Sequence, residues 1–272
     1  MWNSLKTGFI INLALTSVSY VKELLYDINF VAYAVYESVS TIGMVAYMNT
    51  IEKPDIKQQN KESNLTINFI SSSALKIVGI TTIKCITHSA LINGGFVNNS
   101  ELVSDSYILP VINFVVRSFA FEMIFDCAHY VVHRSFHEFP VLYQNVHKYH
   151  HEYSNPTAWT AFHIHPVDLM LSYSIPLLVA TIFIFPTKNE LLMITTYLTH
   201  QEIGGHLGKR MYPTSCFAQF IWLPRIFDIE LYTEDHDLHH KQINCNFGKR
   251  FALCDKMFNT YKSGTESGTE CN

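Results

Sequence analysis

Charged side chains are scarce in this chain. They make up 15% of its 272 residues, while hydrophobic residues make up 48%. A soluble domain carries about 25% charged residues. The formal net charge is -4 at pH 7 and no basic tract occurs, so the composition gives no reason to expect a nucleic-acid partner. The shortage of charge instead indicates a membrane protein.

Cysteine patterns and cofactor fingerprints are also missing. The six cysteines include no CxxC pair and no regular framework, which argues against a zinc ribbon or a disulfide scaffold. The chain has no GxGxxG fingerprint, no haem motif and no Glu-x-x-His pattern of the kind used by carboxylate-bound two-metal enzymes. The first residues, MWNSLKTGF, have no clear cleavage site, so we expect no removable signal peptide.

Apolar runs predict an all-α membrane protein with about four to five transmembrane or re-entrant helices. Residues 9–21 are shorter than the roughly 20 residues that a spanning helix needs, so we expect an interfacial or marginal helix there. Residues 30–48 are a better spanning candidate, because Glu37 is their only charge. Residues 67–97 are long enough to cross.

Residues 108–133 form one continuous pattern, which would extend about 39 Å as a helix. Its far end therefore carries His129 and His133 beyond the hydrocarbon. We expect Arg117 and Glu122 to make polar contacts inside the bundle, because charged groups at membrane depth face a bundle interior or a cavity.

Two further apolar runs and the basic loops set the predicted topology. Residues 169–186 and 190–206 are separated by a tight turn and predict a helical hairpin. Lysine and arginine concentrate in loops 52–66, 134–168 and 208–272. The positive-inside rule places these three loops, and with them a His-rich cap, on the cytosolic side.

Histidines form the most informative pattern. Thirteen of the fourteen lie between residues 129 and 240. Three clusters stand out: HYVVH with His129 and His133, HKYHH with His147, His150 and His151, and HDLHH with His236, His239 and His240. Residues three and four apart lie on one face of a helix, so each cluster can direct its rings to one point. The clusters therefore predict metal binding.

The number of histidines favours two metals. Neutral imidazole binds iron, zinc, copper and nickel, so the ligand type does not choose the metal. A catalytic zinc site takes three protein ligands and water, whereas eight to ten histidines suffice for two metals with open positions. Two such metals beside a membrane suit O₂ activation, because oxidising an unactivated C–H bond needs an oxidant that side chains cannot supply.

The segments HYVVH, HKYHHE, HPVD and HDLHHKQINCNFGKRFALCDKMFNTYK resemble the fatty acid hydroxylase and sterol desaturase superfamily of membrane non-haem di-iron enzymes. The resemblance covers residues 107–262 and is closest to the sterol C-4 methyl oxidase and cholesterol 25-hydroxylase branches. It divides the chain into an N-terminal membrane region (1–106) and a catalytic domain (107–262), while the polar composition of the last residues predicts a flexible tail (263–272). The metal ligands that it implies are His129, His133, His147, His150, His151, His165, His206, His236, His239 and His240.

The same resemblance implies a function. Two iron ions and O₂ would hydroxylate a membrane lipid, with a sterol as the expected substrate. Electrons would come from NAD(P)H through a separate carrier such as cytochrome b5, and the protein would lie in the endoplasmic reticulum membrane. Alternatives are a fatty acid or sphingolipid hydroxylase or a sterol C-5 desaturase of the same superfamily. Outside it, a zinc-dependent membrane hydrolase and a histidine-rich metal transporter stay open.

The other histidines are expected not to bind metal. His137 lies four residues after His133, but Pro140 follows closely and predicts a helix end, so we expect a surface or supporting role for it. We expect His88, His163 and His200 to make polar contacts or to point elsewhere.

Overall fold

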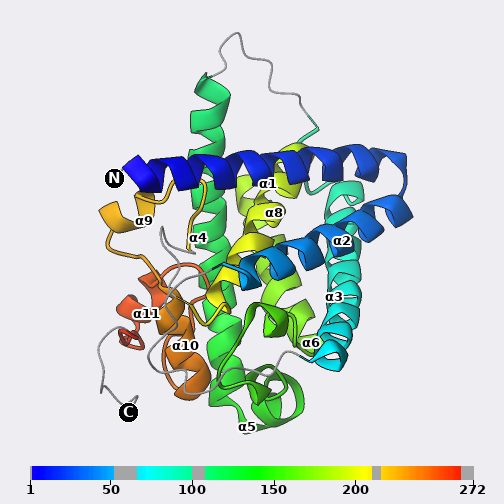
Figure 1. The fold of residues 1–272 in the computed structure, drawn as a ribbon. Helices are drawn as coiled ribbons and strands as arrows, with labels where there is room; N and C mark the ends of the chain where they lie inside the picture. Colours follow the sequence, from blue (N-terminus) through cyan, green and yellow to red (C-terminus); the bar gives the residue numbers. More distant parts are fainter. Residues whose placement is uncertain (1, 52–65, 100–107, 210–215, 265–272) are drawn as a thin grey trace.

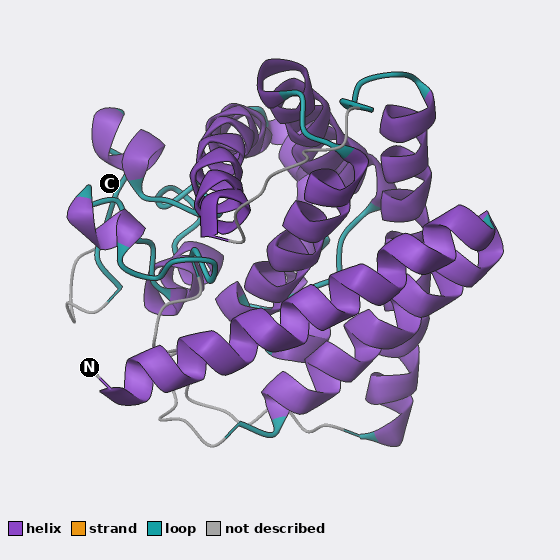
Figure 2. Ribbon diagram, turned by 90° about the horizontal axis from the view of Figure 1, so that it is seen from above, coloured by secondary structure: helices purple, strands orange, loops and turns teal. Residues whose placement is uncertain are grey.

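The computed structural model describes residues 2–51, 66–99, 108–209 and 216–264, and these form helices and loops with no strand (Figures 1 and 2). The long helices are α1 (Trp2–Ile28), α2 (Phe30–Asn49), α3 (Ile67–Asn93), α4 (Ile108–Glu138), α7 (Ile175–Ile184) and α8 (Lys188–Gly205). The short elements between α4 and α7 are α5 (Pro140–Leu142), η1 (Tyr143–His147), η2 (His150–Glu152), η3 (Ala158–Thr160), α6 (Pro166–Leu169) and η4 (Met170–Ser174). After α8 come α9 (Leu223–Ile226), α10 (Thr233–Lys241) and α11 (Leu253–Met257). The prediction of an all-α fold is confirmed.

Four helices in the described residues are long and apolar enough to cross a membrane. By length and composition these are Leu5–Ile28, Ile67–Asn93, Ile108–Glu138 and Pro166–Ile184. Large apolar side chains also cover the outside of the bundle: Phe9, Leu75 and Phe183 are 69%, 74% and 72% exposed. So much exposed apolar surface is unusual for a soluble monomer and fits a lipid environment.

The first two helices differ from the prediction. The sequence favoured residues 30–48 over residues 9–21 as a membrane span, but the structure makes α1 the longer helix, and α2 is not among the candidate spans. Helix α1 continues beyond the apolar run at both ends, and Lys22, just after that run, is buried and paired. Its Nζ lies 3.1 Å from Glu37 Oε2 and donates to Thr195 Oγ1 at 3.1 Å. This contact joins α1, α2 and α8.

Arg117 and Glu122 both make the polar contacts predicted for them, although the Arg117 side chain is still 32% exposed. Arg117 Nε donates to Glu190 Oε1 at 2.9 Å. Glu190 also belongs to the capping box that begins α8 at Thr187. Glu122 is fully buried and accepts from Gln219 Nε2 at 2.5 Å. Both contacts tie α4 to the second half of the chain.

Loops that the sequence placed on opposite sides lie at opposite ends of α4. Near its N-terminal end, Asn98 N–H donates to Pro186 O at 2.8 Å. At the other end, the rings of Phe69 and Tyr153 lie 6.0 Å apart, which places the start of α3 beside the second histidine cluster. Parts of loops 52–66, 98–106 and 208–215 and most of the tail lie outside the described residues, and the cytosolic orientation stays a prediction.

The short elements gather around the C-terminal half of α4. Figure 1 shows α5, α6, α10 and α11 around this half, while α1 crosses α4 near its other end. In the view from above, α1 again lies across the bundle (Figure 2). Almost all histidines therefore come to one end of the molecule.

Candidate metal centre

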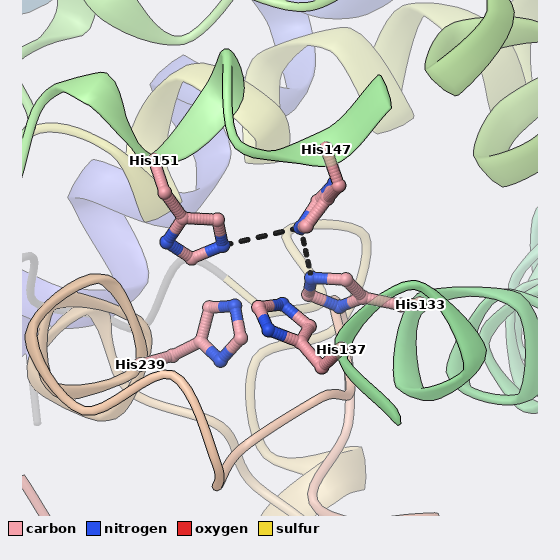
Figure 3. A group of neighbouring side chains, drawn as sticks. All are labelled: His133, His137, His147, His151 and His239. Atoms are coloured by element: carbon pink, nitrogen blue, oxygen red, sulfur yellow. Dashed lines mark hydrogen bonds between the residues drawn. The ribbon is translucent and has the colours of Figure 1, made fainter. Parts of the chain in front are cut away.

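Five histidines converge at the end of α4. His133 and His137 come from α4, His147 and His151 from the segment after it, and His239 from α10 (Figure 3). We call them the five-histidine group. Their candidate ligand nitrogens all lie within 4.8 Å of one another, although His133 and His239 are 106 residues apart in sequence. The spacing fits a single metal ion.

Four more histidines form a second group, all of them buried. This four-histidine group consists of His150, His206, His236 and His240, again with ligand nitrogens within 4.8 Å. The two groups adjoin, since the ring centroids of His151 and His240 are 4.9 Å apart. Together they can hold two neighbouring metal ions.

Helical spacing explains how one motif serves both groups. On α10, His236 and His240 are four residues apart and share a face, while His239 is turned to the other group. In the second cluster, His147 and His151 are four apart and join the five-histidine group, whereas His150 joins the four-histidine group. The two groups are therefore interleaved and must fold together.

The outward nitrogens of these rings are fixed by hydrogen bonds. His133 Nδ1 donates to Phe247 O at 2.7 Å, and His239 Nδ1 donates to Cys245 O at 2.7 Å. His147 Nδ1 donates to Asp168 Oδ2 at 2.6 Å. Such outer contacts set the tautomer of a metal-binding histidine and orient its ring. They leave the Nε2 lone pairs pointing inward.

The inward nitrogens face one another. His147 Nε2 lies 3.1 Å from His133 Nε2 and 3.1 Å from His151 Nε2 (Figure 3). Because His133 and His147 carry their protons on Nδ1, this contact joins two lone pairs, which repel without a cation between them. Within the described residues, His239 Nε2 and His240 Nε2 are buried without any hydrogen-bond partner. Both observations fit a bound metal ion.

The four-histidine group is built in the same way. His206 Nδ1 donates to Glu202 O at 2.8 Å, and His150 Nδ1 donates to His163 O at 3.3 Å. His206 Nε2 then lies 3.1 Å from His236 Nε2. An all-imidazole set with four nitrogens suits iron, zinc or copper.

The structure brings eight of the ten predicted ligands into the two groups. They are His133, His147, His150, His151, His206, His236, His239 and His240. The other two lie outside both groups. His129 Nδ1 donates to Ser172 O at 2.7 Å. His165 Nδ1 accepts from Val167 N–H at 3.2 Å and so caps α6.

His137 is the ligand candidate that sequence reasoning missed. The prediction of a surface or supporting role was wrong about its place, because its ring lies inside the five-histidine group. Helix α4 ends at Glu138, close to Pro140 as expected, so His137 still belongs to the helix. His137 therefore shares a face with His133, one turn further along. The four-residue spacing after His133 was the available signal.

Apart from His137, the histidines expected not to bind metal stay outside the groups. His88 bridges two tyrosines, with Nδ1 2.6 Å from Tyr33 Oη and Nε2 2.8 Å from Tyr173 Oη. His163 contacts Glu152 Oε2 at 2.6 Å. His200 is in neither group.

The carboxylate of Asp168 gives a direct test of ring orientation. We expect Asp168→Asn to weaken metal binding at the five-histidine group by about 10- to 100-fold, because the carboxylate accepts from His147 Nδ1 and fixes the orientation of that ring. Chelator competition on the purified protein measures the change. Glu152→Gln is the matched control, since Glu152 adjoins His151 but pairs with His163. Equal affinities for the two variants would contradict the role of Asp168.

Burial also sets the protonation of the rings. It lowers the pKa of His150, His236 and His240 well below the usual 6.5, and neighbouring imidazoles lower it further. The pKa of His239 falls to about 3 through burial. These rings are therefore neutral at pH 7, the form that binds metal.

A pH dependence of stability follows from these pKa values. Below about pH 6.5 the histidines of the unfolded chain take up protons, while the buried rings of the folded, metal-free protein do not. The free energy of unfolding should therefore decrease as the pH falls below about 6.5, by roughly 1.4 kcal/mol per histidine and pH unit. Thermal unfolding of the chelator-treated protein between pH 8 and pH 5 measures this. An unchanged melting temperature over that range would count against neutral, buried rings.

Comparison with known proteins places this site in a family. Residues 118–260, more than half of the chain, match the family model described as fatty acid hydroxylase. Similar proteins include a fatty acid hydroxylase of Lecanicillium sp, which is 34% identical over 52% of this chain and 40% of its own length. The C-4 methylsterol oxidase of Schizosaccharomyces pombe is 27% identical over 56% of this chain and 49% of its own length. A Delta(7)-sterol 5(6)-desaturase of Gibberella zeae is 31% identical over 52% of this chain and 40% of its own length.

The matches leave parts of these relatives uncovered. The chain spans about half the length, or less, of the curated relatives it matches. No solved structure matches it. The matched segment contains all nine histidines of the two groups. The chain belongs to the fatty acid hydroxylase family.

Proposed function

We propose that the protein is a membrane oxidoreductase that uses two iron ions and O₂ to hydroxylate a lipid, with a sterol as substrate. The observation that carries the proposal is the pair of adjoining histidine groups, nine rings in all, at one end of an apolar helical bundle. Relatives named as sterol oxidases, desaturases and hydroxylases support the sterol. Iron, when bound, would supply the O₂ activation that side chains lack.

The chain's own residues would hold and shield the metals. Carbonyl and carboxylate acceptors at Nδ1 fix the ring orientations, and the buried position of the four-histidine group excludes bulk water. Exclusion of water protects reactive species from side reactions. No nicotinamide fingerprint occurs in the sequence, so electrons from NAD(P)H would arrive through a separate carrier such as cytochrome b5.

Location follows from the basic loops. Loops 134–168 and 208–272 adjoin the histidine groups and carry much of the lysine and arginine, so we place this end of the bundle in the cytosol. The sterol-enzyme relatives favour the endoplasmic reticulum membrane.

A fatty acyl lipid is the second candidate substrate, because one relative at 34% identity is named as a fatty acid hydroxylase. Expression in a microbe that lacks a sterol oxidase, followed by mass spectrometry of its lipids, separates the two. We expect an oxidised sterol with the wild-type chain and none with His236→Ala. An oxidised acyl chain instead would favour the second candidate. Bound zinc without O₂ consumption would contradict the oxidation itself and favour a hydrolase.

A further inference from the structure

Two cysteine side chains meet between α4 and α11. Cys254 Sγ donates to Cys127 Sγ at 3.2 Å, although the two residues are 127 positions apart in sequence. Both thiols are free in the structure. The sulfurs of a disulfide lie about 2.0 Å apart, so these two need to approach by only about 1.2 Å to form one. The fold therefore holds the two thiols where they can be joined.

Each cysteine is next to a carboxylate that anchors the same loop, residues 247–251. Asp126 accepts from the backbone N–H groups of the loop's last three residues. Asp255 accepts from those of its first two residues, at 2.8 and 2.7 Å. These bonds hold the loop between α4 and α11. They thereby also fix the contact between Cys127 and Cys254.

The same loop positions a ring of the five-histidine group. Phe247 O accepts from His133 Nδ1 at 2.7 Å. Phe247 and Cys254 pack with Tyr130 of α4 in one apolar cluster, and Cys127 packs against this cluster. A bond between the two sulfurs would therefore also hold the acceptor of His133 in place.

The two thiols differ in exposure. Cys127 is half-buried, whereas Cys254 is 5% exposed. Val131, four residues after Cys127 on α4, is 62% exposed. Residues four apart on a helix share a face, so Cys127 lies close to the outer surface. A small uncharged oxidant can reach Cys127 first, with Cys254 beside it to complete a disulfide, which is the arrangement of redox-sensing cysteines.

We propose that Cys127 and Cys254 are a redox-active pair that hydrogen peroxide converts into a disulfide, which fastens α11 and loop 247–251 to α4. Cys127 Sγ attacks one peroxide oxygen and the O–O bond breaks, which gives a sulfenic acid on Cys127 and one water. Cys254 Sγ then attacks that sulfur, so that the S–S bond forms and the hydroxyl group leaves as a second water. Two thiols are oxidised by two electrons in all, and one peroxide is reduced to two waters.

The pair acts independently of the proposed lipid oxidation, because the peroxide comes from outside and neither cysteine belongs to a histidine group. On the cytosolic side of a membrane, cellular thiols keep such a pair reduced, and its disulfide forms only when the surroundings become oxidising. The disulfide would then stabilise the metal centre while peroxide is present.

The first test asks whether the disulfide forms. The full chain in phosphatidylcholine nanodiscs is treated with hydrogen peroxide and then catalase, or with dithiothreitol, and its peptides are analysed by mass spectrometry after alkylation. We expect a peptide cross-linked between Cys127 and Cys254 after peroxide and none after dithiothreitol. Cys85, fully buried in α3, should stay a thiol in both samples. Absence of the cross-link in wild type would overturn the proposal, and so would equal oxidation of Cys85.

The second test asks whether the disulfide fastens the loop. Chelator-treated protein with the cross-link should unfold at least about 5 °C above the reduced protein, because the bond closes a long loop of the unfolded chain. A chelator should remove metal from the cross-linked, metal-bound protein at least about threefold more slowly, since local opening of the loop is restricted. Cross-linked protein that equals the reduced protein in either measurement would overturn the fastening role.

Three variants make both tests specific. Cys127→Ser should show no cross-link, and peroxide should leave its unfolding temperature and metal release unchanged. Cys85→Ala is the matched control, which loses a thiol elsewhere and should keep the cross-link and both of its effects. Cys254→Ser gives the same information as Cys127→Ser if that variant folds poorly. Stabilisation of Cys127→Ser by peroxide would overturn the proposal, because the effect would then arise at another site.

Discussion

Replacing His236 with alanine is expected to lower lipid oxidation by on the order of 10³-fold or more. His236 is one of only four rings in its group, and its Nε2 lies 3.1 Å from His206 Nε2. Without it, only three imidazoles of this group would remain to hold an ion. Product formation per folded protein, measured by mass spectrometry, gives the effect. Circular dichroism of each variant shows that the helices are retained.

His137 and His165 make this prediction specific. His137→Ala should cost as much activity as His236→Ala, because its ring belongs to the five-histidine group. His165→Ala should stay within about tenfold of wild type, since that ring caps a short helix and lies outside both groups. A severe loss with His165→Ala beside a mild loss with His137→Ala would show that the geometry described here is not that of the working site.

The second large effect is expected at Asp126. Its carboxylate accepts three backbone hydrogen bonds, from Lys249 N and Arg250 N at 2.8 Å each and from Phe251 N at 3.1 Å. These bonds close the loop after α10 onto α4. Asp126→Ala would leave three N–H groups without their acceptor, and an unsatisfied buried group costs about 1–3 kcal/mol. We expect a loss of at least about 3 kcal/mol in stability and loss of both metals.

Asp126→Asn is the graded control. Its remaining carbonyl oxygen can still accept from Lys249 and Arg250, which both bond to the same carboxylate oxygen, so a smaller loss is expected. Thermal unfolding and metal content of the two variants test whether the Asp126 carboxylate holds this loop on α4. Equal stability of wild type and Asp126→Ala would exclude the carboxylate as the clamp of this loop.

Helical spacing made most of the site predictable from sequence. His147 and His151, and likewise His236 and His240, are four residues apart, and each pair lies in one group. The expectation that each cluster directs all its rings to one point was wrong, because His150 and His239, three residues after His147 and His236, join the other group. The apolar run of residues 108–133 likewise predicted the long helix α4. These features depend on local periodicity alone.

The choice between His129 and His137 was not predictable in this way. Both lie four residues from His133, so spacing admits either one. Tertiary contacts decide, because the chain after α4 turns back and brings His147 and His151 onto His137, which lies in the five-histidine group, whereas His129 lies in neither group. The length of α1 was not predictable for a similar reason. Lys22 ends the apolar run in the sequence, and its buried contact with Glu37 becomes visible only in the folded structure.

The central claim is that nine histidines form two separate metal sites. The most direct measurement is the metal content of the purified protein and of two double variants, by mass spectrometry of the elements. We predict two iron ions per chain in wild type, and about one in both His236→Ala/His240→Ala and His147→Ala/His239→Ala, each of which disables one group. A wild-type protein with fewer than two metals, or double variants that keep both, would contradict the two-site account.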